Sequence, residues 1–151
     1  MDRSFLNEAL CQLIDGEKWI SFQHRKRPSM ISVDRVLSNT WSQGRYNYYM
    51  RTRLAEYKPI NVTRIRLDAR TFYLINDGNH RNEAAKTLGH KRIKAIITGE
   101  YILSSGDYYV RNSLVWRTKS EGVAEIFSFN KLNKEVIDCL RELGIKEKIS
   151  W

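Results

Sequence analysis

One segment, residues 73–89 with the sequence YLINDGNHRNEAAKTLG, changes its hydrophobic period within a few residues. An apolar run typical of a β-strand stops at Asp77-Gly78, and a pattern typical of a helix begins almost at once. The chain must turn tightly between the two, which Gly78 permits because it has no Cβ atom. A strand, a turn and a helix in this order predict a domain that combines a sheet with helices.

Further strand and helix patterns lie on both sides of this segment. Strand-like runs occupy 18–22, 30–37, 59–68, 70–77, 91–102, 107–118 and 123–129, and helical patterns occupy 5–14, 46–57, 80–89 and 132–143. We predict an α+β fold with a small mixed sheet covered by helices. A chain of 151 residues suits a single domain, for which we predict a core at about 31–103 and a C-terminal extension, 104–151, that ends in a helix.

Helix ends and buried faces can also be predicted. In the helix at 80–89, Ala84, Ala85 and Leu88 should point inward, and Gly89 is a natural left-handed C-terminal residue. In the last helix, Asn130 or Asn133 can cap the start and Gly144 can end it.

The overall composition favours a phosphate-rich partner. The formal net charge is +9, which attracts nucleic acids and nucleotides over long distances. No apolar run approaches the roughly 20 residues of a membrane span, so we expect a cytoplasmic protein with no membrane partner. Cys11 and Cys139 lie far apart without a metal-binding spacing, and we expect each to be a small buried apolar side chain.

The turn between strand and helix is the main candidate site. A helix that begins directly after a strand leaves its first backbone N–H groups free to face an anion, and Gly78 lets a phosphate approach closely. His80 and Arg81 add side-chain donors, and Asn79 can cap the helix or contact the ligand or its metal. The alternative is an ordinary Asp-Gly hairpin turn, with Asn79 as a simple cap and Arg81 on the solvated surface.

A resemblance to a known family extends this prediction. The stretch PINV, followed after a gap by FYLINDGNHRNEAAKTLGHKRIKAIITG, resembles the core of the ParB and sulfiredoxin superfamily, and ISVDRVLSN with Arg45 is similar to the start of the ParB N-terminal domain. The likeness covers about 31–99. It implies a nucleoside triphosphate, ATP or CTP with magnesium, held by Gly78, Asn79, His80 and Arg81. Arg45 would reach the same phosphates if the upstream likeness holds, and the alternative for Arg45 is exposure to solvent.

The departures from that family limit the reaction. Sulfiredoxin has a catalytic cysteine where this chain has Asn79, so sulfinic acid reduction is not expected. Partition-type ParB proteins carry Glu-Arg-Arg where this chain has Asn79-His80-Arg81, which argues against CTP hydrolysis of that type. Those proteins also continue into a helix-turn-helix domain, which the tail of this chain does not resemble. Asp77 and His80 are the catalytic candidates, with Asp77 as a metal ligand or base, or else a turn residue. We expect Glu83 to be a helix-dipole carboxylate.

Two basic clusters are candidates for nucleic-acid contact. Arg25, Lys26 and Arg27 follow His24, and Arg51, Arg53 and Lys58 alternate with Tyr46, Tyr48, Tyr49 and Tyr57. Cations neutralise phosphates and aromatic rings stack on exposed bases. The alternatives are a solvated basic surface and tyrosines that pack inward, and for the tyrosines we favour packing.

The leading hypothesis is therefore a ParB-like protein that binds nucleotide and nucleic acid and can hydrolyse nucleoside triphosphate or DNA. A small-molecule phosphotransferase on the same fold is one alternative. A non-catalytic DNA- or protein-binding regulator of a mobile element is another. Because relatives on one fold perform different reactions, the resemblance leaves the reaction open.

Overall fold

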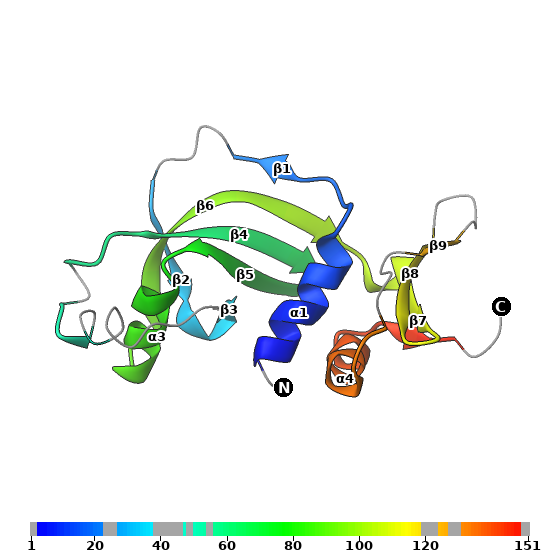
Figure 1. Ribbon diagram of the computed structural model, residues 1–151. Coiled ribbons are helices and arrows are strands. Elements are labelled where there is room, and N and C mark those ends of the chain that lie inside the picture. The colour runs from blue at the N-terminus through cyan, green and yellow to red at the C-terminus, as the bar shows by residue number, and fades with distance from the viewer. Residues whose placement is uncertain are drawn as a thin grey trace. The chain divides into compact units, whose positions relative to one another are not determined.

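The computed structural model describes residues 3–22, 27–37, 47, 50–53, 56–118, 124–126 and 131–148. These residues confirm the predicted α+β class (Figure 1). The elements in chain order are α1 (Arg3–Ile14), β1 (Ile20–Ser21), β2 (Ser29–Ser32), η1 (Val33–Arg35), β3 (Val36–Leu37), β4 (Ile60–Leu67), β5 (Arg70–Asp77), α3 (Asn79–Thr87), β6 (Arg92–Leu103), η3 (Ser105–Asp107), β7 (Tyr108–Arg111), β8 (Leu114–Thr118), β9 (Ala124–Ile126), α4 (Lys134–Glu142) and β10 (Lys146–Glu147). Of the helix predicted at 46–57, residues 46, 48, 49, 54 and 55 lie outside the described residues. Asn47 and Met50 are helical, but residues 51–53 are not, so the predicted helix does not run unbroken to Tyr57.

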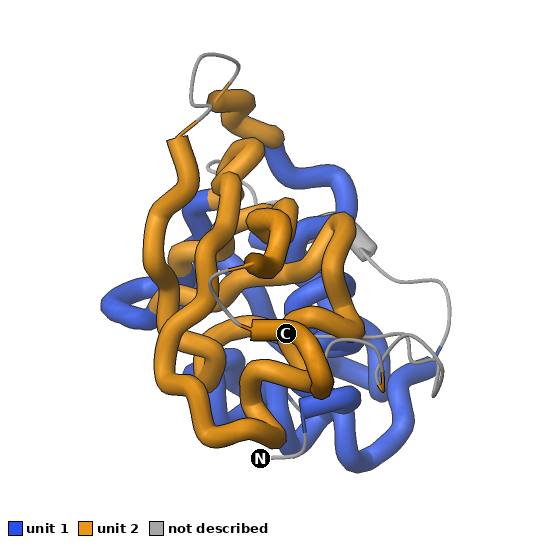
Figure 2. The backbone as a smooth tube through the Cα atoms, turned by 90° about the vertical axis from the view of Figure 1, so that its left-hand side faces the viewer, with its two compact units in different colours: residues 1–18, 67–70, 102–151 blue, residues 19–66, 71–101 orange. Residues whose placement is uncertain are grey.

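The chain divides into two compact units (Figure 2). Unit 1 comprises residues 1–18, 67–70 and 102–151, and unit 2 comprises residues 19–66 and 71–101. The core predicted at 31–103 corresponds largely to unit 2, and the extension predicted at 104–151 lies entirely in unit 1. The assignment of the whole chain to one domain stays a prediction.

Unit 2 is built around a mixed sheet. Its strand order is β1-β6-β4-β5-β3, and β2 also pairs with β6. β1 and β2 run antiparallel to β6, whereas β3 runs parallel to β5. β4 and β5 are joined by a two-residue turn and are therefore antiparallel, and β4 and β6 point the same way in Figure 1. The predicted mixed sheet is confirmed.

The core of unit 2 lies on one face of this sheet. On β6 the inward residues alternate, so that Ile93, Ala95 and Ile97 join the core while their neighbours face the other way. Ala85 of α3 belongs to the same cluster and covers the sheet. Leu88, which we predicted to point inward, is 42% exposed. It occupies the C-cap position after the last helical residue, where the buried stripe of the helix has ended.

Unit 1 contains a second sheet with the order β10-β7-β8-β9. The continuous strand predicted at 107–118 is wrong, because β7 and β8 are two antiparallel strands of a hairpin. Asn112 and Ser113 form its turn with φ values of 53° and 60°. Two successive left-handed residues match the twist of a tight hairpin, and alternating apolar residues on each side do not reveal such a turn.

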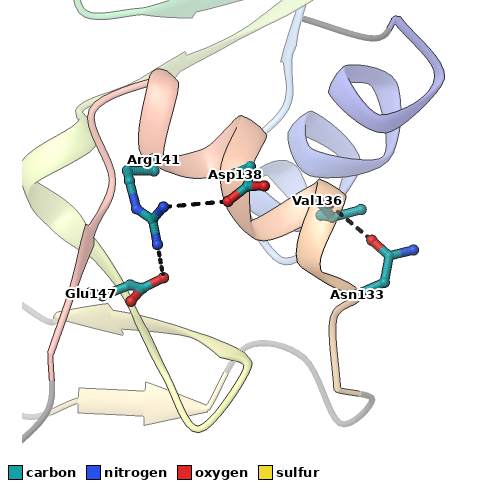
Figure 3. Close-up of polar contacts among 5 residues, drawn as sticks. All are labelled: Asn133, Val136, Asp138, Arg141 and Glu147. Atoms are coloured by element: carbon teal, nitrogen blue, oxygen red, sulfur yellow. Dashed lines mark hydrogen bonds and ion pairs between the residues drawn. The ribbon is translucent and has the colours of Figure 1, made fainter.

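Two helices complete the core of unit 1. α1 packs against α4, and the buried side chains are Leu6, Leu10 and Leu13 on α1 and Val136, Leu140 and Leu143 in and after α4. Asn133 caps α4, since its Oδ1 accepts a hydrogen bond from the Val136 amide at 3.0 Å (Figure 3). Gly144 ends the helix with φ 94°, as predicted.

The two cysteines differ in burial. Cys139 is buried on α4, as expected, but Cys11 is exposed, contrary to our prediction. Cys11 follows the fully buried Leu10, and one helical step turns its side chain by roughly 100° away from the apolar stripe.

A polar cluster ties the segment after α1 to the hairpin of unit 1. The Tyr108 hydroxyl donates a hydrogen bond to Glu17, whose carboxylate also pairs with Arg117 at 3.0 Å. Arg117 donates to the Asp15 carbonyl at 2.8 Å. Burial, followed by the Glu17 carboxylate, raises the pKa of Tyr108 far above its ordinary value of 10.0. Tyr108 therefore stays a protonated donor.

Replacing Tyr108 by phenylalanine should destabilise the protein by about 1–2 kcal/mol at neutral pH, because Glu17 loses a donor. The raised pKa adds a pH dependence. Below pH 10.0 the contribution is complete, and above it the unfolded chain releases a proton that the folded chain keeps, so stability falls. Urea unfolding should show a smaller alkaline loss in Tyr108→Phe than in the wild type. The control Tyr101→Phe, which leaves this cluster intact, should keep the wild-type alkaline slope.

Candidate nucleic-acid interface and the strand-to-helix turn

The structure confirms that a helix follows the strand at the predicted turn. β5 ends at Asp77 and α3 begins at Asn79, so the hairpin alternative is wrong. Gly78 occupies the N-cap position with φ 113° and ψ 25°, a left-handed conformation that favours glycine. The predicted cap by Asn79 is therefore also wrong, because Asn79 is already the first helical residue.

Gly78 is required for packing as well as for backbone conformation. A Cβ atom built on Gly78 would lie 2.4 Å from Cγ2 of Ile60 and 3.0 Å from Nη2 of Arg81. Ile60 is fully buried in β4. The space beside Gly78 that a side chain would fill is thus occupied by the protein itself, and a phosphate cannot enter there.

Arg81 is buried and its donors are used inside unit 2. Only 6% of the residue is exposed. Its Nη1 donates to the carbonyl oxygens of Lys58 at 2.8 Å and Pro59 at 3.0 Å, and its Nη2 pairs with Asp77 at 3.1 Å. The alternative of a solvated Arg81 is wrong. Arg81 holds the turn against the segment that enters β4, and its contact with a phosphate stays a prediction.

The remaining candidates at the turn differ in environment. The Asp77 side chain is 71% exposed although one oxygen pairs with Arg81. His80 Nε2 is buried and has no hydrogen-bond partner among the described residues. Arg45 lies outside the described residues. Glu83 approaches Lys86 at 3.9 Å on the surface of α3. Within the described part of the chain, no group of three His, Cys, Asp or Glu residues could hold a metal ion.

The other face of the unit 2 sheet carries exposed cations. Because Ile93, Ala95 and Ile97 enter the core, Arg92, Lys94, Ile96 and Thr98 must face the opposite side. Arg92 and Lys94 are exposed, and neither forms an ion pair with a described residue. On the neighbouring β2, Ser32 pairs in register with Arg92, and Met30, which is 49% exposed, pairs with Lys94.

Side-chain hydrogen bonds extend this face across the sheet. Asn76 on β5 donates to the hydroxyl of Thr63 on β4 and to that of Thr98 on β6, each at 3.2 Å. Thr98 in turn donates to the Val62 carbonyl at 3.1 Å. We call the surface formed by Met30, Asn76, Arg92, Lys94 and Thr98 the basic face; Thr63, the partner of Asn76, is only 6% exposed.

Other cations of unit 2 are engaged or lie elsewhere. Arg64 and Arg66 both pair with the buried Glu100, at 2.6 and 3.2 Å, so one of their two positive charges is compensated. Among the predicted nucleic-acid contacts, Arg25 and Lys26 lie outside the described residues. The others are described and exposed: Arg27, Arg51, Arg53 and Lys58.

The tyrosine prediction can be assessed at one position. Tyr57 is 4% exposed and belongs to the core, which confirms inward packing there. Tyr46, Tyr48 and Tyr49 lie outside the described residues.

Sequence analysis did not single out Arg92 and Lys94. The signal was present in KRIKAI, where cations alternate with apolar residues that a strand would bury. That alternation places both cations on one face, but only the sheet shows which other side chains share it.

Comparison with known protein families finds no family model that matches the chain, and comparison with curated proteins finds no significant sequence match. No helix in the described ranges is long and apolar enough to cross a membrane.

Alanine substitutions at three different glycines separate the two roles of Gly78, its left-handed backbone conformation and its packing against Ile60. Gly78→Ala should lower the free energy of unfolding by roughly 2–4 kcal/mol, because left-handed strain and the clash with Ile60 add. Gly89→Ala, with φ 81° and no atom within 4 Å of the new Cβ, should cost about 1 kcal/mol through strain alone. Gly106→Ala has neither problem and should be nearly neutral. If urea unfolding shows that Gly78→Ala loses no more free energy of unfolding than Gly89→Ala, the packing role of Gly78 is contradicted.

Proposed function

We propose that the protein binds nucleic acid through the basic face of unit 2. The observation that carries the proposal is the pair Arg92 and Lys94, which are exposed on one side of a strand whose other side is buried. Their positions are fixed by a sheet, while neither charge is neutralised by a described acid. Two fixed and unpaired cations next to polar side chains suit the regularly spaced phosphates of a nucleic-acid strand.

The chemistry of the face favours contact with the phosphate backbone over recognition of bases. Asn76, the amide of the face, already donates to two threonine hydroxyls, so its hydrogen-bonding capacity toward a base edge is partly used. Arginine and lysine on a sheet surface bind phosphate groups, which are the same in every nucleic-acid sequence. A sheet that packs one face on the core can leave its other face polar and solvated, and the binding experiment distinguishes such a face from a ligand surface.

Fluorescence anisotropy with a labelled duplex and a labelled single strand, over a series of salt concentrations, tests the proposal. Arg92→Ala/Lys94→Ala should weaken binding and reduce the slope of log K against log salt by about two, since each lost phosphate contact removes about one unit. The matched control is Lys131→Ala/Lys134→Ala, which removes the same charge from exposed lysines of unit 1.

Equal weakening in both double variants would mean that only net charge matters, and the basic face would lose its assignment. Unfolding curves for the two variants should match the wild type, because all four side chains are exposed.

A second candidate function is nucleotide binding at the first turn of α3, as the ParB and sulfiredoxin resemblance implies. It is favoured by the buried Nε2 of His80, which has no described partner, at a helix start that follows the left-handed Gly78. The nucleotide would be ATP or CTP with magnesium, its phosphates facing the helix amides. The internal bonds of Arg81 make His80 the more direct probe.

Isothermal titration with ATP, CTP and ADP in magnesium tests this second candidate. His80→Ala should abolish binding while retaining the fold. Arg81→Ala should instead destabilise the protein by roughly 2–4 kcal/mol, because the Lys58 and Pro59 carbonyls lose a charged donor. A wild type that binds none of the three nucleotides would exclude the nucleotide function and would leave the nucleic-acid proposal standing.

A further inference from the structure

Unit 1 contains a cavity of about 350 Å³ beside its sheet. Its wall includes Ser105, Tyr108, Tyr109, Thr118, Lys146 and Lys148. This volume falls in the range of small-ligand sites, which combine an apolar or aromatic wall with a few polar groups. All of these residues belong to unit 1, so the cavity is separate from the basic face.

The charge of the cavity is positive because successive residues of the extended segment 146–148, which consists of β10 and the residue after it, point in opposite directions. Lys146 and Lys148 line the cavity, whereas Glu147 between them does not. The Glu147 carboxylate instead accepts a hydrogen bond from Arg141 on α4 at 2.6 Å, as Figure 3 shows. No carboxylate side chain is among the described residues that line the cavity. Two ammonium groups therefore share it without a lining counter-charge.

The aromatic wall is held in a fixed position. Tyr109 and Trp116 stack with ring centroids 6.1 Å apart and planes 4° apart. The Trp116 indole donates to the Arg111 carbonyl at 3.1 Å. The Lys148 ammonium lies 4.3 Å from the centroid of the Tyr109 ring. A ligand that attracts Lys148 would change the surroundings of this stack.

Ser105, another residue that lines the cavity, is held in place by hydrogen bonds. The Ser105 amide donates to Asp68 at 3.1 Å, and the hydrogen bonds from Ser105 lower the pKa of Asp68 below its ordinary value. A Cβ atom on Gly144 would lie 3.4 Å from the Ser105 hydroxyl oxygen, so the two backbones pass close together. The nearby Asp68 charge is thus engaged with Ser105.

We infer that this cavity binds a small molecule carrying a phosphate group, with the phosphate between Lys146 and Lys148 and the organic part against Tyr109. Ammonium groups bind phosphate as point charges, and Lys146 of β10 and Lys148 directly after β10 supply them. A different explanation for the lysines is that β10 is an edge strand, where lysine prevents pairing with another chain. That explanation predicts no ligand.

Isothermal titration provides the test, and the emission of the four tryptophans of the chain, among them Trp116, is a second readout. The probes are inorganic phosphate, ribose 5-phosphate, AMP and adenosine, added to the full chain. AMP or ribose 5-phosphate should bind and shift the tryptophan emission, and adenosine should not bind. Lys146→Ala and Lys148→Ala should each weaken binding at least about tenfold, as expected for loss of a charged hydrogen bond. The control Lys134→Ala, an exposed lysine at the start of α4, should bind like the wild type.

Three outcomes would overturn the inference. The first is that the wild type binds none of the phosphorylated probes. The second is that Lys146→Ala and Lys134→Ala bind equally well. The third is equal affinity for inorganic phosphate and AMP, because then the aromatic wall takes no part. Because Lys148 also packs on Tyr109, Lys148→Ala can fail to fold, and the affinity of Lys146→Ala then decides the test.

Discussion

The guanidinium group of Arg81 holds together two parts of unit 2 that are separate in sequence, the segment before β4 and the turn from β5 into α3. It binds the carbonyls of Lys58 and Pro59 before β4, and it pairs with Asp77 at the end of β5 while it belongs to the first turns of α3. These bonds satisfy a buried charge that would otherwise be costly. With the left-handed Gly78 beside Ile60, they fix where α3 starts and therefore how Ala85 covers the sheet.

The same arrangement changes which residues are suited to bind an anion. Arg81 is drawn inward by backbone carbonyls, and the chain after α3 enters β6 with Arg92 and Lys94 on the side away from the core. Arg64 and Arg66 instead share the buried carboxylate of Glu100, which compensates one of their two positive charges. In unit 1 an arginine likewise binds a nearby carboxylate. Arg141 donates a hydrogen bond to Glu147, and Lys146 and Lys148 on either side of Glu147 line a cavity.

Much of the fold could be predicted because its signals are local. Period-two and period-3.6 patterns located β4, β5, β6 and α3, and glycine marked two helix ends at Gly89 and Gly144. The errors also have local causes. The Asn112-Ser113 turn contains no glycine, and Leu88 continues the apolar spacing of α3 although the helix has already ended. Such boundaries depend on backbone angles that the pattern of apolar residues does not encode.

From the amino-acid sequence alone one can derive the α+β class, the excess of positive charge and the strand-to-helix switch at Gly78, because these depend on neighbouring residues and on composition. Tertiary structure decided which charges are free. Whether Arg81 reaches solvent depends on the carbonyls of Lys58 and Pro59, 23 and 22 residues away, and Arg64 meets its acid 36 residues along the chain. Ion pairs and hydrogen bonds act across space, so the availability of a charge is a property of the folded chain.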